Sequence, residues 1–180
     1  DVCNSATSRL STANLPTSRW RVMDDAPYED GEPVSWYLVK ISDPSNPHMT
    51  MISGTPDQAQ GVTAVDVGAP THHTVASVFW EFMNSRGTLY DEAADQYVDD
   101  RLWANPFYAT GYPITDAYWI NTWVAGEYTR VLVQCFERRC LTYTPSNPDG
   151  RKVEMGNIGQ HYYYWRYGEK PWEAVTDPNG

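Results

Sequence analysis

The segment 128-YTRVLVQCFERRCLTYTP-145 decides the fold, because two runs rich in β-forming residues flank a short polar turn. β-branched and aromatic residues favour strands, and the central FERR reverses the chain direction. A preceding run of the same kind, AYWINTWV (117–124), is separated from this segment by the turn AGE (125–127). The sequence therefore predicts two consecutive antiparallel hairpins between residues 117 and 145.

Cys135 and Cys140 flank the FERR turn. If Glu137 and Arg138 form the turn, the cysteines lie directly opposite each other, with Cβ atoms about 4.5–5.5 Å apart, and a disulfide is feasible. If the turn lies at Arg138 and Arg139, they are only diagonal neighbours and the bond is difficult. We predict the disulfide, the alternative being two reduced buried thiols. Cys3 is then the odd cysteine, and it would bond to another chain or be a free thiol.

Strand-like runs continue upstream of this region. RWRVM (19–23), SWYLVKIS (35–42), HMTMIS (48–53) and VTAVDV (62–67) predict a small antiparallel sheet, with DPSNP as a turn. Residues 1–18 are polar and read as an arm. The domain prediction is thus a polar N-terminal arm (1–18), a small antiparallel β region (19–67) and a helix/hairpin module (68–180).

The module begins with a helical pattern. Apolar residues recur with a period of 3.6 from Val75 to Met83, which predicts a helix from about Val75 to Ser85 with Thr74 as N-cap and Gly87 as C-cap. The acidic stretch DEAADQYVDD (91–100) that follows has no D-x-D-x-D-G calcium pattern. We expect it to be a solvated, irregular loop, with weak calcium binding as the alternative.

The aromatic stretch NIGQHYYYWRYG (157–168) has two readings. With a period of two, alternate aromatic residues share one strand face; with a period of 3.6, Ile158 and Trp165 share a helix face. β-propensity favours the strand, whereas the possible caps Asn157 and Gly168 favour the helix.

Three short motifs resemble the LGFP-type repeat of secreted bacterial proteins: GYPIT (111–115), the FERR hairpin, and VEMGNIG (153–159). They are even more similar to an uncharacterised relative of that repeat in large surface and secreted proteins. The resemblance covers about residues 75–168. It departs at Arg139, where the repeat usually has a turn glycine, and it includes one full copy. It implies that residues 157–168 form a second short helix. The predicted fold class is therefore α+β and β-rich, with antiparallel sheets and hairpins and two short helices.

Composition excludes several partners. The formal net charge is −10 and the isoelectric point is about 4.7, so the chain repels phosphate backbones and anionic lipid surfaces. We expect no nucleic-acid partner and no membrane insertion, because no apolar run reaches the roughly 20 residues of a spanning helix. The start at Asp1 reads as that of a processed, secreted protein.

Catalytic motifs are not found in the sequence. It contains no G-x-S-x-G, H-E-x-x-H or glycine-rich phosphate loop, so the prediction is a protein that is not an enzyme and needs no cofactor. His72 and His73 could ligate a metal, but no converging ligands are evident, and we expect them to be exposed turn residues. His161 reads as a packed, hydrogen-bonded histidine.

Aromatic residues exceed the evident need of one core, so we predict that some contact a partner or a glycan. The candidate contact residues are Tyr163, Tyr164, Trp165, Tyr167, Trp172, Trp119 and Trp123, with Cys3 in an intermolecular arm. The functional hypothesis is an extracellular structural protein at the cell surface, a subunit of a self-assembling homo-oligomer or filament. The alternative is a module that binds cell-wall glycan or another polysaccharide, and a hydrolase is the least favoured class.

Overall fold

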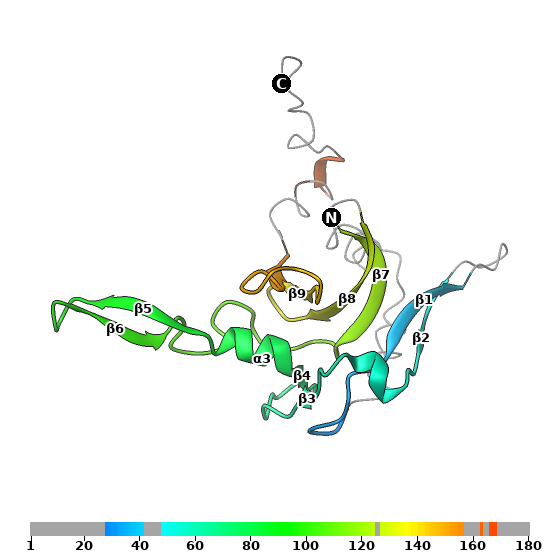
Figure 1. Cartoon of the computed structure of the whole chain (residues 1–180), viewed down its shortest axis with the longest axis horizontal. Helices are drawn as coiled ribbons and strands as arrows, with labels where there is room; N and C mark the ends of the chain where they lie inside the picture. The colour runs from blue at the N-terminus through cyan, green and yellow to red at the C-terminus, as the bar shows by residue number, and fades with distance from the viewer. Residues whose placement is uncertain (1–27, 42–47, 125–126, 157–162, 164–165, 169–180) are drawn as a thin grey trace, which may run out of the picture.

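The computed structural model describes residues 28–41, 48–124, 127–156, 163 and 166–168 of the 180-residue chain. A six-stranded sheet with the strand order β10-β9-β8-β7-β1-β2 forms the body (Figure 1). Its strands are β1 (Tyr37–Ile41), β2 (His48–Ile52), β7 (Tyr118–Val124), β8 (Glu127–Cys135), β9 (Cys140–Tyr143) and β10 (Val153–Met155). Neighbouring strands are antiparallel except β1 and β7, which are parallel.

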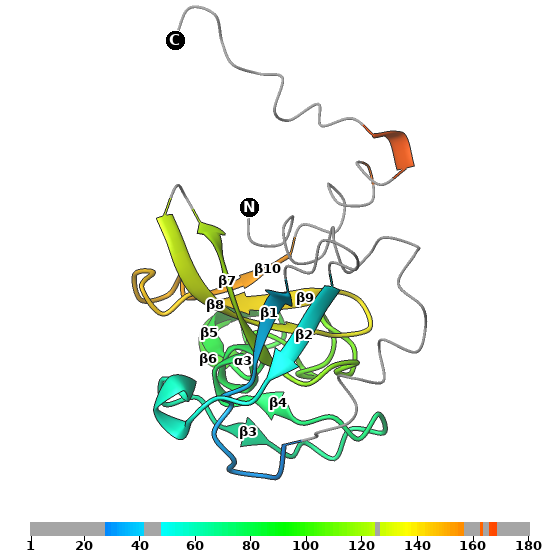
Figure 2. The same ribbon diagram turned by 90° about the vertical axis from the view of Figure 1, so that its right-hand side faces the viewer.

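Smaller elements flank this sheet. They are the 3-10 helix η2 (Pro56–Ala59), the paired strands β3 (Ala64–Val65) and β4 (Val75–Ala76), the helix α3 (Ser77–Met83), and the hairpin of β5 (Arg86–Asp91) and β6 (Gln96–Arg101). Figure 2, seen from the β1–β2 side, shows α3 behind the sheet and β3–β4 at its lower end. The predicted β-rich fold with antiparallel sheets is confirmed.

The two predicted hairpins between residues 117 and 145 are both present. Cys135 lies directly opposite Cys140, and the N–H of Phe136 donates to the carbonyl of Arg139 at 2.9 Å. Glu137 and Arg138 therefore form the turn, which is the register that brings the two cysteines together.

The core lies on both faces of the central strands. On one face, Phe79 and Met83 of α3 pack with Trp119, Leu132 and Leu141. On the other face, a second cluster contains Tyr118, Ile120, Val131 and Val133. Successive side chains of a strand point to opposite faces, so the continuous apolar run of β8 supplies both clusters.

The helix α3 is shorter than predicted. Val75 and Ala76 form β4 and not the first turn of the helix. Their backbones pair with Val65 and Ala64 of β3, and both side chains are buried. The N-cap is Ala76 and not Thr74, and no side-chain cap hydrogen bond is present. Gly87 lies within β5 and not at a helix C-cap, and a Cβ there would meet Leu102 Cδ2 at 2.8 Å.

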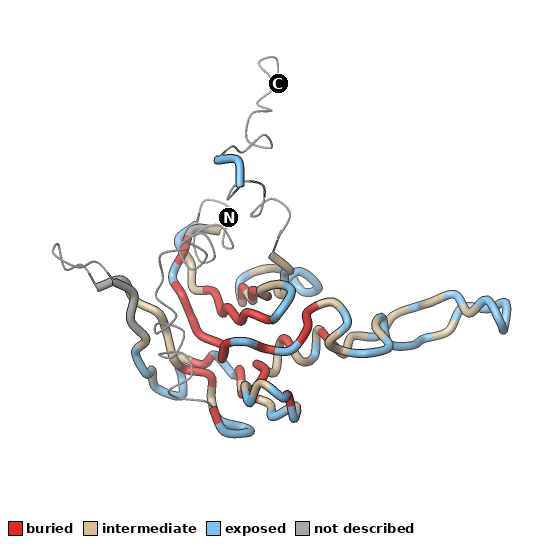
Figure 3. The backbone as a smooth tube through the Cα atoms, turned by 180° about the vertical axis from the view of Figure 1, so that it is seen from behind, coloured by how far each residue is buried: buried red, intermediate tan, exposed pale blue. Residues whose placement is uncertain are grey.

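The acidic stretch 91–100 was predicted to be an irregular loop, and this is wrong. Residues 86–101 form the β5–β6 hairpin, which extends far from the body (Figure 1). Exposed and half-exposed residues line its whole length, whereas buried residues concentrate in β4, in β7 and in the second half of β8 (Figure 3). We call residues 86–101 the β5–β6 arm.

The predicted boundary between residues 19–67 and 68–180 does not coincide with a break in the sheet. β1 and β2 form a hairpin, and β1 also pairs with β7 through Tyr37 and Trp119. The described part of the N-terminal region thus extends the sheet of the C-terminal module. The predicted arm 1–18 and the run 19–23 lie outside the described residues.

The prediction of two short helices is right only in part. The described residues contain one α-helix with defined bounds, α3, together with the 3-10 helix η2. Tyr163, Arg166 and Tyr167 have helical backbone, but the rest of the predicted helix, including residues 157–162, lies outside the described part. A search of the described residues for a helix long and apolar enough to cross a membrane finds none.

Candidate functional site

The β5–β6 arm carries the most exposed aromatic pair of the described chain. Tyr90 and Tyr97 are cross-strand partners, with ring centroids 5.4 Å apart and exposed fractions of 52% and 75%. Cross-strand aromatic pairs stabilise hairpins, which explains why this segment forms strands despite its acidic composition. The pair nevertheless leaves a large apolar area in contact with water.

Polar contacts hold both ends of the arm. At its base, Arg86 Nε donates to Asp99 Oδ2 at 3.1 Å, and this exposed ion pair contributes little stability by itself. At the tip, Asp91 Oδ1 accepts from the N–H groups of Ala93 and Ala94. The hydroxyl of Tyr90 donates to Asp95, and this carboxylate raises the pKa of Tyr90. These contacts define a four-residue turn with Asp95 at a φ of 51°.

The arm is strongly acidic. From Gly87 to Asp100 it has five acidic residues and no lysine or arginine. Among the described residues, no group of three His, Cys, Asp or Glu side chains is arranged to hold a metal ion. Of these acids, Asp91 and Asp95 accept hydrogen bonds within the tip and Asp99 and Asp100 are paired with Arg86, whereas Glu92 is exposed at the turn.

The GYP loop is tied to the FERR turn. Gly111 has a φ of 71°, and Glu137 Oε2 accepts from the N–H of Tyr112 at 3.1 Å. The N–H of Glu137 donates to the carbonyl of Tyr112, and that of Arg138 donates to the carbonyl of Thr110. Two of the three motifs that carry the LGFP resemblance, GYPIT and FERR, are thus joined by three hydrogen bonds in one junction.

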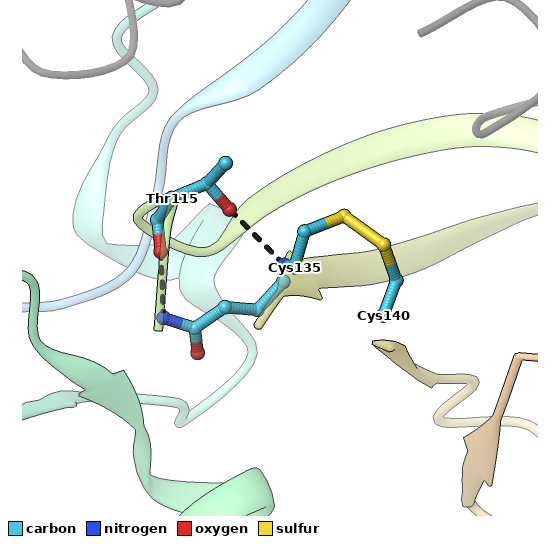
Figure 4. The surroundings of a disulfide bond; sticks show 4 residues. Thr115, Cys135 and Cys140 are labelled. Carbon is cyan, nitrogen blue, oxygen red and sulfur yellow. Dashed lines mark hydrogen bonds between the residues drawn. A yellow bond between two sulfur atoms is a disulfide. The ribbon is translucent and has the colours of Figure 1, made fainter. Parts of the chain in front are cut away.

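A buried glutamine and the disulfide complete this junction (Figure 4). Gln134 Nε2 donates to the carbonyls of Thr74 and Thr115, and its Oε1 accepts from the N–H of Ala76. Thr115 Oγ1 accepts from the N–H of Cys135 at 3.0 Å. The Sγ atoms of Cys135 and Cys140 are 2.04 Å apart, at disulfide distance, in agreement with the predicted bond.

His73 and Asp116 form a pair that the sequence analysis missed. His73 Nδ1 is 3.3 Å from Asp116 Oδ1, and both side chains are largely buried. The expectation that His73 is an exposed turn residue is therefore wrong, whereas His72 is exposed. No local signal relates residues 43 positions apart, so only the packing of residues 71–76 beside the start of β7 could show this contact.

A ring cluster of Trp80, Phe107 and Tyr112 lies between α3 and the GYP loop. Its centroid distances are 5.7 Å for Trp80–Phe107 and 4.8 Å for Phe107–Tyr112, with interplanar angles of 39° and 45°. These tilted rings do not make a flat stacking platform, although Tyr112 and the neighbouring Tyr108 are exposed.

The predicted contact residues have different outcomes. Trp119 is 0% exposed and its Nε1 donates to the carbonyl of Val34, so its prediction as a contact residue is wrong. Tyr167 is exposed and Tyr163 is half-buried, with their rings 4.7 Å apart. Tyr164, Trp165, Trp172, Cys3 and the side chain of Trp123 lie outside the described residues.

Arg130 of β8 stands out among the cations. Its guanidinium carbon lies 5.1 Å from the ring centroid of Trp119 and 5.7 Å from that of Tyr37. Burial lowers the pKa of Arg130, and its Nη2 atom is enclosed without a hydrogen-bond partner. Aromatic faces offset part of the cost of removing a cation from water, but they do not satisfy its N–H donors.

Comparison of the chain with protein families, with curated proteins and with solved structures finds no match. The resemblance to the LGFP-type repeat accordingly stays a prediction.

Proposed function

We propose that this protein is a non-enzymatic extracellular structural subunit that assembles with further copies of itself through the β5–β6 arm. The observation that carries the proposal is the exposed pair Tyr90 and Tyr97 on a hairpin that extends away from the body. A two-stranded hairpin is only marginally stable alone in water, and exposed aromatic area on such an element favours a covering partner.

An extracellular location is supported by the pair Cys135 and Cys140 at disulfide distance, since disulfides persist in oxidising compartments. The non-enzymatic part of the proposal is supported by the sequence, which contains none of the nucleophile, zinc or phosphate-loop motifs searched for.

The free energy of covering the two tyrosine rings can be compared with the cost of bringing two copies together. Covering the exposed parts of two tyrosine rings removes on the order of 200 Å² from water, or about 5 kcal/mol. Association costs about 4–15 kcal/mol in lost translational and rotational freedom. The free energy gained by covering the two rings therefore offsets only the lower estimate of the association cost. A stable assembly needs additional polar or main-chain contacts.

The test is the oligomeric state of the purified chain as a function of concentration. Light scattering after size exclusion, with negative-stain imaging, should show elongated particles that grow with concentration. The double variant Tyr90→Ser/Tyr97→Ser should remain monomeric. Tyr108→Ser removes an equally exposed tyrosine outside the arm and should assemble normally. A strictly monomeric native protein at high concentration would overturn the proposal.

The alternative function is binding of cell-wall glycan. Exposed Tyr108 and Tyr112 favour it, because aromatic rings at a surface can stack on sugars. The tilts of 39° and 45° within the ring cluster disfavour it, because a flat sugar face needs rings that are close to coplanar. A pull-down on insoluble cell-wall glycan distinguishes the two functions: retention that Tyr112→Ala abolishes would support the alternative.

A further inference from the structure

The β5–β6 arm is a two-stranded sheet, and neither of its outer edges has another strand beside it within the described part of the chain. Figure 1 shows the arm extending away from the body, so both edges are open along its length. Unpaired strand edges are a common place for a strand of another chain to add to a sheet. The main-chain groups of the two edges decide which of them can accept one.

The hydrogen-bond pattern of the hairpin determines which main-chain groups point outward. The N–H of Leu102 donates to the carbonyl of Ser85 at 3.0 Å, one position before the pair of Arg86 with Arg101. Hydrogen-bonded and non-hydrogen-bonded pairs alternate along an antiparallel ladder. The outward N–H and C=O groups therefore belong to Arg86, Thr88 and Tyr90 of β5 and to Tyr97, Asp99 and Arg101 of β6.

Side chains cover the outer edge of β6. The outward N–H of Arg101 donates to Asp100 Oδ1 at 2.7 Å, and the outward carbonyl of Asp99 accepts from Arg86 Nη2 at 2.6 Å. An added strand would have to break both of these hydrogen bonds. Charged side chains on an edge strand are a common protection against strand addition.

The outer edge of β5 is not covered in this way. Within the described part of the chain, none of the hydrogen bonds engages the outward main-chain groups of Arg86, Thr88 and Tyr90. All three of these residues are exposed. The edge of β5 is therefore the one that can accept a strand.

The charges along the arm favour one direction for that strand. The base of the arm is close to neutral, because Arg86 and Arg101 lie there with Asp99 and Asp100. The tip carries three acids and no base, namely Asp91, Glu92 and Asp95. Antiparallel pairing with the arm of a second copy places each acidic tip beside the two arginines of the other arm. Parallel pairing would place the two acidic tips together, which is unfavourable.

We propose that the β5 edges of two copies pair antiparallel, so that their arms form one four-stranded sheet in the order β6-β5-β5-β6. This inference rests on the proposed function and identifies the edge, the direction and the symmetry of the contact. Both copies use the same edge, so the contact is isologous and has a two-fold axis. It leaves the two bodies at opposite ends of the paired arms. A two-fold contact closes on itself, so longer particles are built from such pairs through another surface.

The register of the contact follows from the three outward residues of β5. With Thr88 on the two-fold axis, facing Thr88 of the second copy, all three find partners, and Arg86 of each arm lies opposite Tyr90 of the other. A cross-strand threonine pair is favourable, and a guanidinium over a tyrosine ring is an attractive contact. The main-chain hydrogen bonds of this register supply the polar contacts that covering the two rings does not.

A cysteine on the axis tests the register. Thr88→Cys, in a chain that also carries Cys3→Ser, should form a covalent pair of twice the 20.5 kDa protomer mass under a mild oxidant. Asp99→Cys in the same background is the matched control, because Asp99 is the cross-strand partner of Thr88 and lies on the covered edge. This control should remain at the protomer mass in non-reducing electrophoresis.

A proline at the same position tests the main-chain pairing. Thr88→Pro removes an N–H that points outward, so it leaves the hydrogen bonds of the hairpin in place and blocks the β5 edge. The dissociation constant of the pair in sedimentation equilibrium should rise at least tenfold. Thr88→Val keeps the N–H and should pair like the native chain. Near-ultraviolet circular dichroism checks that both variants keep the native fold.

The results separate the two proposals. Native assembly in which Thr88→Cys forms no covalent pair, or in which Asp99→Cys forms one instead, would overturn this inference and leave the proposed function standing. Equal association of Thr88→Pro and Thr88→Val would have the same consequence. A native chain that stays monomeric at high concentration would overturn both proposals.

Discussion

Glu137 packs directly over Gly111: a Cβ built on this glycine would lie 2.6 Å from Glu137 Oε2 and 2.8 Å from Glu137 Cβ. The same carboxylate accepts a hydrogen bond from the N–H of Tyr112. The close approach of the GYP loop and the FERR turn thus depends on the missing side chain at residue 111.

Gly111→Ala should destabilise the fold by about 2–4 kcal/mol, because it adds a steric conflict to a left-handed backbone. Gly150 has a similar φ of 79°, with nothing within 4 Å of a built Cβ, so Gly150→Ala should cost only about 1 kcal/mol. Urea denaturation of both variants measures the difference. Equal losses of stability in the two variants would show that the Glu137 side chain moves aside at no cost in free energy.

Gln134→Glu should be severely destabilising despite its unchanged shape. The buried amide donates to two carbonyls, and a carboxylate in its place would face both carbonyl oxygens without a proton to share. Loss of such buried hydrogen bonds costs about 1–3 kcal/mol for each group left unsatisfied. Denaturant unfolding of this variant should show a loss larger than that of Gln134→Met, which removes the hydrogen bonds without adding charge. The reverse order would contradict the assigned amide orientation.

Tyr118→Phe should leave the fold as stable or slightly more stable at neutral pH, because the hydroxyl of Tyr118 is buried without a hydrogen-bond partner. Tyr28→Phe is the contrasting variant. The Tyr28 hydroxyl accepts from the N–H of Trp36, so its loss should cost about 1–2 kcal/mol. Urea midpoints of the two variants at pH 7 provide the measurement.

The burial of Tyr118 should also make the stability of the fold depend on pH in the alkaline range. Burial raises the pKa of Tyr118 above its ordinary value, so the folded state holds this tyrosine neutral. An unfolded tyrosine ionises near pH 10; the stabilisation is therefore complete below about pH 10 and declines as the pH rises above it. Urea midpoints from pH 8 to 11 should fall less steeply for Tyr118→Phe than for the native chain. Identical slopes would show that Tyr118 ionises freely in the folded protein.

Reduction of the bond between Cys135 and Cys140 should lower stability by about 2 kcal/mol, since it closes only a short loop. The hydrogen bonds of the FERR turn remain, so the reduced protein should still fold. Thermal melts with and without reductant measure the loss, and Cys135→Ser/Cys140→Ser serves as the control that reductant should not affect further. An unchanged melting temperature of the native chain would contradict this expectation.

Local patterns predicted part of the fold and little of the candidate site. The β-forming runs around FERR predicted the hairpin but left two turn registers open for Cys135 and Cys140, and the 3.6-residue period of Val78, Phe79 and Phe82 predicted a helix. The β5–β6 arm was missed because QYVDDR contains three charged residues and the turn has no glycine or asparagine. Asp95 takes the positive φ instead, and the strands are held by the pairing of Tyr90 with Tyr97.

By itself, the sequence determined the β-rich class and the two central hairpins and made the cysteine pairing feasible, because these depend on residues a few positions apart whose periodicity and turn chemistry are local. Only the tertiary structure decided the burial of Trp119, the His73–Asp116 pair, and the pairing of Tyr37 with Trp119 between β1 and β7. Such contacts join segments many residues apart. Their formation depends on how whole surfaces fit once the chain is closed, and no short stretch of residues encodes that fit.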